Sequence, residues 1–522
     1  MARIDGCAGM SDVAALPTGR TAEVLRRIGN WCAANPLLLC ALILLIAPFW
    51  QMRWGTVGDT AWLIHVCEQI LSGQRLYIDV VETNPPASVM LYMPPVWLAS
   101  RLGVDADVLT AAYSYAVVLF GLGFAAWIVR RGSLADWAAL RVASPLVLAL
   151  FVLMPGNAFS EREHLGTAML LPLLALAAWR AKPDAQTLRP WTAAGAGLCG
   201  SLIVILKPHY GVVVIACAAF VAWRRRDWRR IFDIEYWAAG TLSLAYAATV
   251  VLAFPEFLSD IYPDLRDVYL PIRSYLPILV NFAGGYVLAM ALCWRLLRGT
   301  HSDLAPLLVT ASLAGLLPVI IQAKAWPYHV YPAVTIVLLA LICLVAMRRP
   351  ATRLPSWKLV AVAVVACWAP FFPTQKPPSD LLAQIEREAP RPSVALIGSD
   401  LAFGLPLARL AGGTWVSRNN ADWKGAGALY MRSLAKAQGR DAEARQLDAL
   451  LTVHVTEKLG ELERTRPDLL VLQTEEGFWI DHMKAQPRFA ALLAEYELMR
   501  AEKRYWIYRR VRPAPSPVAA SG

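Results

Sequence analysis

The sequence predicts a polytopic α-helical membrane protein with about eleven transmembrane helices and a small C-terminal α/β domain outside the cytoplasm. Three observations predict this class: the composition, the spacing of the apolar runs, and a change of pattern after Pro373. Hydrophobic residues make up 57% of the 522 residues and charged residues only 17%, whereas soluble domains average about 45–50% and about 25%. This balance excludes a soluble enzyme, a disordered scaffold and a disulfide-rich secreted module.

Apolar runs close to 20 residues, the length that crosses a bilayer as a helix, recur between a polar tail (residues 1–35) and Pro373. No small-residue cleavage site follows the first run, so we expect it to be an uncleaved anchor. The predicted spans are 36–52, 108–129, 139–154, 165–180, 192–206, 210–223, 236–254, 278–297, 304–321, 328–347 and 357–372.

The net charge of +11 reports membrane topology rather than a nucleic-acid partner. The basic residues fall in short bursts between apolar runs, which is typical of cytoplasmic loops, and do not gather on one binding face. We therefore expect a cytoplasmic N-terminus and an external C-terminal domain. The bursts include Arg130-Arg131, Arg180 with Lys182, Arg224-Arg225-Arg226, Arg295 with Arg298, and Arg348-Arg349 with Arg353. The nine cysteines contain no CxxC pair and most lie in apolar runs, so neither a disulfide framework nor a thiolate metal site is expected.

Two external segments are too long to be simple turns. Residues 53–107 are expected to form two short helices, Asp59–Ser72 and Ser88–Leu102, joined by an extended Tyr77–Pro86 stretch. The Pro pair at the end of that stretch blocks helix formation there. Residues 255–277, rich in Pro, Asp and Tyr, form the second segment. Long loops in compact proteins are commonly functional.

Residues 374–522 change to a pattern of alternating strands and helices. Strands are predicted at 393–398, 413–416 and 469–472, and helices at 379–388 and 401–410. This alternation predicts a small α/β domain. No glycine fingerprint follows the first strand, so nucleotide binding is not indicated.

The predicted topology gathers most of the acid–base and cationic side chains on the external side of the membrane. We expect the helices of residues 53–107 to wall a cavity that the loops with Glu161 and Lys324 close. The candidate site residues are Asp59, Glu82, Asn84, Glu161, Arg162, Glu163, Lys207, His209, Lys324 and His329.

Each candidate also has a purely structural interpretation. Asp59 opens an apolar-periodic run and can serve as a helix N-cap, whereas a functional Asp at this interface can take a proton from a hydroxyl. Arg162 and Lys207 can snorkel at helix ends or bind a phosphate. The aromatic residues around Lys324 and His329 are typical of an interfacial belt. The collection of these residues on one side of the membrane favours the functional interpretation.

Several of these residues carry a resemblance to a known superfamily. Asp59 follows soon after the first span, and the block Gly73-Gln74-Arg75-Leu76-Tyr77-Ile78-Asp79 leads through Glu82 to Asn84-Pro85-Pro86. A further acid, Glu161 or Glu163, lies near the end of the third span. With these features, residues 36–372 resemble the GT-C superfamily of integral-membrane glycosyltransferases, which includes protein mannosyltransferases and the aminoarabinose transferase of lipid A.

The resemblance implies an inverting transfer of a sugar from a polyprenyl-phosphate donor to a glycan, lipid or protein acceptor. It places the reaction on the periplasmic face of a bacterial inner membrane, with Asp59 as the general base and Glu82 and Glu161 as the next candidates. Asn84 stands where related transferases often carry Lys, so Lys207, Lys324, Arg162 or His329 would contact the donor phosphate instead. No cofactor is demanded, although a divalent metal can bind through Asp59, Glu82 or Glu161.

Two other classes of function stay open. A transporter or flippase of a lipid-linked or anionic substrate would place ionisable groups near the middle of the membrane and on both sides of it. A non-catalytic membrane scaffold would use the external domain to bind a partner, and its loop acids would tolerate replacement by Ala.

Overall fold

The computed structural model describes residues 20–56, 58–348 and 357–511. Part of the predicted cytoplasmic tail (residues 1–19, with Cys7), the basic positions Arg349 and Arg353, and the end of the predicted external domain (residues 512–522) lie outside the described residues.

A helix stands at each of the eleven predicted spans, after a first short helix α1 (Arg20–Ala34). Six of the eleven are long and apolar enough to cross a membrane: α6, α8, α11, α13 to α14, α15 to α16, and α17. These findings confirm the predicted class of a polytopic helical membrane protein. The helices are α2 (Pro36–Gln51), α6 (Ala106–Arg131), α7 (Trp137–Val152), α8 (Arg162–Ala181), α9 (Pro190–Leu206), α10 (Gly211–Arg225), α11 (Ile234–Ala253), α13 to α14 (Tyr275–Leu297), α15 to α16 (Ala305–Gln322), α17 (Pro327–Met347) and α18 (Trp357–Trp368).

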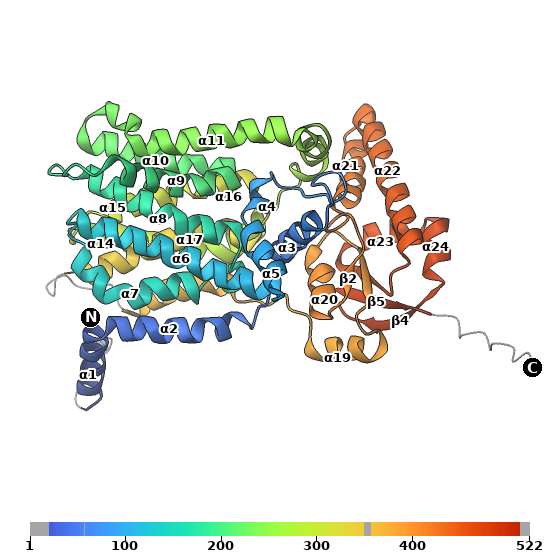
Figure 1. The fold of residues 1–522 in the computed structure, drawn as a ribbon, viewed down its shortest axis with the longest axis horizontal. Coiled ribbons are helices and arrows are strands. Elements are labelled where there is room, and N and C mark those ends of the chain that lie inside the picture. The colour runs from blue at the N-terminus through green and yellow to red at the C-terminus, as the bar shows by residue number, and fades with distance from the viewer. Residues whose placement is uncertain (1–19, 57, 349–356, 512–522) are drawn as a thin grey trace, which may run out of the picture.

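Helices α8 and α17 form the centre of the bundle (Figure 1), and most of their residues are buried. Small residues allow the close packing that membrane helices favour: a Cβ on Gly121 of α6 would stand 2.2 Å from the Ala168 carbonyl oxygen of α8. The outer helices instead expose large apolar side chains, such as Leu37 and Leu252, each 81% exposed. An apolar exterior around an apolar core is what a lipid environment requires.

The arginine-rich turns lie together at one end of the bundle. Arg225 donates a hydrogen bond to the carbonyl oxygen of Lys182, and the Lys182 ammonium donates to the Ser133 carbonyl oxygen at 3.0 Å. The same ammonium lies 3.8 Å from a carboxylate oxygen of Asp303. The α/β part of the chain packs against the opposite end (Figure 1). Which end faces the cytoplasm stays a prediction.

The two long segments that are predicted to be external differ from the expectation in two places. Helix α3 (Gly58–Leu71) matches the first predicted helix, but the second is interrupted and forms α4 (Ala87–Met90) and α5 (Met93–Leu102). Pro94 and Pro95 cause the interruption, because proline lacks the N–H that would continue the helix and clashes with the preceding turn. Residues 255–277 are not an irregular loop but contain the π-helical turns η4 (Phe257–Ile261) and η5 (Leu265–Tyr269) around α12 (Tyr262–Asp264).

A five-stranded sheet in the order β2-β1-β3-β5-β4 organises the C-terminal part. Strands β1 (Ser393–Ile397), β2 (Thr414–Trp415) and β3 (Leu469–Gln473) are parallel, as the predicted alternation requires, and β4 (Tyr496–Ala501) and β5 (Tyr505–Arg510) form an antiparallel hairpin that the sequence analysis missed. The predicted helix 401–410 is broken into a 3₁₀ turn (η8, Leu401–Phe403) and α20 (Leu405–Leu410), because Gly404 and Pro406 interrupt it.

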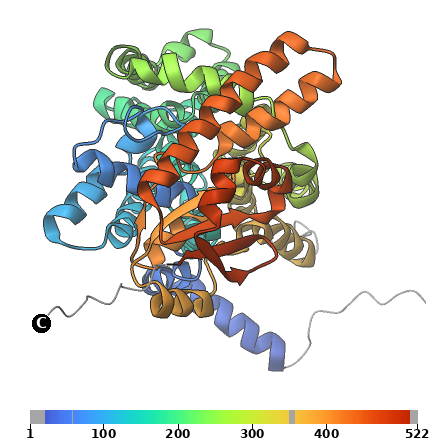
Figure 2. The same ribbon diagram turned by 90° about the vertical axis from the view of Figure 1, so that its right-hand side faces the viewer.

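Helices cover both faces of this sheet, and Figure 2 looks onto it with the bundle behind. Apolar residues of α19 (Ser379–Glu388) and α20 pack on one face. The other face is covered by α21 (Trp423–Ala437), α22 (Asp441–Thr465), α23 (Gly477–Lys484) and α24 (Pro487–Leu493).

Two contacts fix the α/β part to residues 53–107 and to the bundle. Arg409 of α20 pairs with Glu68 of α3 at 2.8 Å and with Asp107 of α6 at 2.9 Å. The Val81 N–H donates to the Arg418 carbonyl oxygen at 3.1 Å. These contacts hold the carboxyl ends of β1 and β2 over the end of the bundle.

Candidate active site

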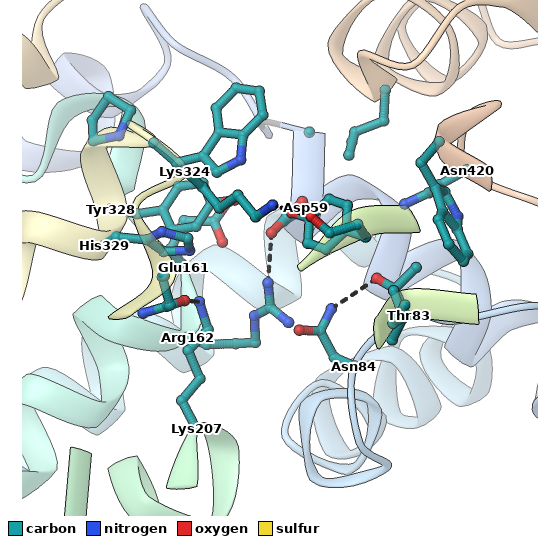
Figure 3. A pocket seen from close by; sticks show the side chains of 18 of the residues that line it. Asp59, Thr83, Asn84, Glu161, Arg162, Lys207, Lys324, Tyr328, His329 and Asn420 are labelled. Atoms are coloured by element: carbon teal, nitrogen blue, oxygen red, sulfur yellow. Dashed lines mark hydrogen bonds and ion pairs between the residues drawn. The ribbon is translucent and has the colours of Figure 1, made fainter. Parts of the chain in front are cut away.

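A cavity of about 420 Å³ lies between the end of the helical bundle and the α/β part. It is lined by the start of α3, the Thr83–Pro85 segment, the starts of α8 and α17, the loops around Lys207 and Lys324, and two loops of the α/β part. Figure 3 shows how these segments converge. Eight of the ten candidate residues line it: Asp59, Asn84, Glu161, Arg162, Lys207, His209, Lys324 and His329.

The backbone is strained at several positions that present these side chains. Ser160, immediately before Glu161, has φ +66°, and Ala323 and Ala325 on either side of Lys324 have φ +46° and +62°. A left-handed conformation costs a non-glycine residue about 1–2 kcal/mol, and such strain concentrates at functional sites. In addition, α3, α8 and α17 all begin at the cavity, so their N-terminal partial positive charges favour an anion there.

Asp59 and Arg162 form the central ion pair of the cavity. Nη2 of Arg162 lies 2.5 Å from Oδ2 of Asp59, and Nη1 donates to Oγ of Ser88 at 3.3 Å. The Arg162 side chain is only 2% exposed, whereas that of Asp59 is 17% exposed. The pair therefore holds a carboxylate in a fixed position where a bound molecule can still reach it.

Glu161 occupies the residue before α8 and is 1% exposed. Burial raises the pKa of this carboxyl well above its usual range, and the nearby negative charge of Asp59 adds to the rise. Its Oε2 atom has no hydrogen-bond partner among the described residues. Glu161 is thus a second carboxyl group in the cavity whose environment favours holding a proton.

Glu163 lies behind the wall, where it pairs with Lys207. The Glu163 carboxylate is also 3.8 Å from Nε2 of His329. Nζ of Lys207 lies 3.4 Å from Oε1 of Gln322 and 5.3 Å from the ring centroid of Tyr328. The buried Glu163 carboxylate therefore holds Lys207 in the wall of the cavity.

Burial lowers the pKa of both Lys324 and His209. Nζ of Lys324 donates to the carbonyl oxygens of Tyr269 and Ile272 and lies 3.9 Å from the Tyr269 ring centroid. Burial, together with the charge of Arg273, lowers the pKa of Lys324 to about 8. Burial, followed by the charge of Lys207, lowers the pKa of His209 to about 4, so this ring is neutral near pH 7.

Glu82 lies behind Asn84 rather than in the lining. One of its carboxylate oxygens accepts from Nε1 of Trp62 at 2.5 Å, and the other accepts from the Asn84 N–H at 2.7 Å and from Asn84 Nδ2 at 2.5 Å. These contacts orient the Asn84 amide, which does line the cavity. Burial raises the pKa of Glu82, and the charge of Arg162 opposes the rise.

The acids do not assemble into a metal site in the part of the chain that the structure describes: no group of three or more His, Cys, Asp or Glu side chains is placed to hold an ion. Sequence reasoning also missed part of the lining, since Tyr269, Asn420 and Trp423 reach the cavity from distant segments. The aromatic content of residues 255–277 was a signal for Tyr269. No local pattern singles out Asn420.

The fold and the cavity together define a polytopic helical membrane protein with a cavity at one end of its bundle, lined by both apolar and charged side chains. The crystal structure of ArnT from Cupriavidus metallidurans in the apo state, an aminoarabinose transferase of the GT-C class, has this fold. The two share a TM-score of 0.53 and 12% sequence identity over 92% of this chain and 98% of that chain. No protein-family model and no curated protein matches the sequence. The resemblance carried by Asp59 and the Tyr77–Pro86 stretch is thus confirmed at the level of the fold.

Proposed function

We propose that this protein is an inverting glycosyltransferase that moves a sugar from a polyprenyl-phosphate donor to an acceptor at the periplasmic face of a bacterial inner membrane. One observation carries the proposal: a single cavity at the bundle end holds carboxyl groups beside three cationic side chains. The shared fold with ArnT supports the same class of reaction. In this proposal the N-terminus is cytoplasmic and the cavity end is periplasmic.

The cations account for the leaving group. A polyprenyl phosphate is anchored by its lipid tail, so its phosphate lies at the membrane surface, level with the cavity. Arg162, Lys207 and Lys324 would face the negative charge that grows on the phosphate as its bond to the sugar breaks. Nε of Arg162 has no hydrogen-bond partner within the described ranges, so it is available for such a contact.

The carboxyl groups account for proton removal. Asp59 would take the proton of the acceptor hydroxyl while its oxygen attacks the anomeric carbon. The bond from that carbon to the phosphate oxygen breaks, and its electron pair leaves with the polyprenyl phosphate. Attack on the face opposite the leaving group inverts the anomeric configuration. Glu161 is the alternative base, since it lines the same cavity.

The test is an assay of membranes that contain the full-length protein, with radiolabelled polyprenyl-phosphate sugars as donors and a cell-envelope extract as the acceptor source. We expect transfer of label to the extract together with release of polyprenyl phosphate, and neither in membranes without the protein. A transporter or a scaffold would leave every donor intact, and that result would refute the proposal.

A further inference from the structure

One wall of the cavity comes from the α/β part of the chain, and the reaction scheme above uses no residue of it. Ser399, Asp400, Asn420 and Trp423 line this wall. They follow β1 and β2, at the carboxyl ends of parallel strands. This edge is where open α/β sheets bind ligands.

Asn420 and Trp423 each present a buried polar atom with no protein partner. Asn420 is 7% exposed, and neither its Oδ1 nor Nε1 of Trp423 has a hydrogen-bond partner among residues 20–56, 58–348 and 357–511. Buried polar groups are nearly always hydrogen-bonded in native proteins, so a molecule in the cavity is the expected partner. Figure 3 shows Asn420 near Thr83, across the cavity from Tyr328 and His329.

The segment that carries these two residues is held from within the α/β part. Asp422, fully buried between them, accepts from the Gly398 N–H at 3.2 Å and from Nε1 of Trp479 at 3.1 Å. Its other oxygen lies 3.1 Å from Nζ of Lys458. A site whose supporting residues are fixed in this way is preorganised for a ligand.

The same segment is joined to the catalytic side of the cavity. The Arg418 carbonyl oxygen accepts from the Val81 N–H, three residues before Asn84. The Trp423 ring meets the Tyr269 ring edge to face, with centroids 6.3 Å apart. The wall is therefore continuous with the segments that carry Asn84 and Lys324.

An amide, an indole N–H and aromatic ring surface are the groups that recognise a sugar, because they match its hydroxyl groups and its C–H faces. We infer that Asn420 and Trp423 bind the hydroxyl groups of a sugar ring held in the cavity, so that the α/β part selects which sugar is used. The inference rests on the proposed function. The sugar belongs either to the donor or to the acceptor, and the experiment separates these sources.

The experiment measures how tightly the purified full-length protein in nanodiscs binds two kinds of lipid. The first kind is undecaprenyl phosphate without a sugar, and the second kind is the same lipid phosphate carrying glucose, galactose or mannose. The wild type should bind at least one sugar derivative more tightly than the bare lipid phosphate. Asn420→Ala and Trp423→Phe should each reduce this sugar-dependent gain by about tenfold, the usual effect of losing one hydrogen bond to a ligand, and leave binding of undecaprenyl phosphate unchanged.

Asn419→Ala is the matched control, since Asn419 neighbours Asn420 but does not line the cavity. It should behave as the wild type, and melting curves should show all variants folded. Unchanged donor binding with reduced transfer to the envelope extract would assign the two residues to an acceptor sugar. Wild-type sugar discrimination and wild-type transfer in both variants would overturn the inference. Failure of the wild type to bind any of the lipids would instead overturn the proposed function.

Discussion

The exchange Asp59→Asn separates a catalytic carboxylate from a structural one. Asparagine keeps the size of the side chain and an oxygen that can accept from Nη2 of Arg162, the contact seen at 2.5 Å. The hydrogen bond changes from charge-assisted to ordinary, which should cost about 1 kcal/mol of stability, because the nearby Glu163 still compensates the charge of the buried Arg162. Folded proteins have about 5–15 kcal/mol of stability, so the variant should remain folded and inserted in the membrane.

The effect on the reaction should be far larger than the effect on stability. Removing a general base slows a reaction by about 10²–10⁴-fold, and even about 10²-fold corresponds to about 2.7 kcal/mol of activation free energy. We therefore expect the release of polyprenyl phosphate by purified Asp59→Asn protein to fall at least about 10²-fold. Its melting temperature should shift only slightly.

The matched control is Asp267→Asn, the same chemical change in the other long segment, residues 255–277. Asp267 pairs with its neighbour Arg266 at 2.7 Å and does not line the cavity, so turnover should stay normal. Near-normal turnover in Asp59→Asn would refute the assignment of Asp59 as the base. Glu161→Gln would then be the next variant to measure, because Glu161 lies in the same lining, directly before Arg162, the ion partner of Asp59.

Four further results should follow. Lys207→Ala and Lys324→Ala should each weaken donor use by about 1–3 kcal/mol, the value of a charged hydrogen bond; unchanged donor kinetics in both would leave these residues a structural role. Because the pKa of Lys324 is lowered to about 8, its charge is present below that pH and lost above it. Donor affinity should therefore fall as the pH rises through about 8, and Lys324→Arg, which stays charged, should shift that fall to higher pH; identical profiles would contradict a cationic contact. Asp422→Asn removes the buried carboxylate beside the lysine of α22 and should destabilise the protein by about 3–5 kcal/mol. The control is Asp448→Asn, in an ion pair with Arg432 that water reaches, which should cost less than about 1 kcal/mol. Equal melting temperatures for the two variants would contradict a large contribution of the buried Asp422–Lys458 pair to stability. Finally, a reporter active only in the periplasm should be active when fused after the last residue, and a fluorescent cytoplasmic reporter there would reverse the orientation.

The helical fold was readable from the sequence because its cause is local. A span needs about 20 consecutive apolar residues whatever its neighbours are, so all eleven runs lie on helices. The buried strands β1 and β3 are likewise short, continuous apolar runs. The β4–β5 hairpin was not predicted because most of its residues are only half-buried and charged side chains are mixed with aromatic ones. Its strands therefore show no clear apolar period.

Only the tertiary structure decided which candidate residues line the cavity and which lie behind its wall. The sequence by itself determined that Asp59, Glu161, Lys207 and Lys324 follow or precede spans at one end of the bundle. Only the packing placed Glu163 behind Lys207 as its ion partner. Two opposite charges that are buried away from water are stabilised by direct contact with each other. Only packing, likewise, brought Asn420 to this cavity from more than 300 residues beyond Asp59. Such contacts depend on the docking of a whole sheet against a bundle, and no local pattern of residues encodes that docking.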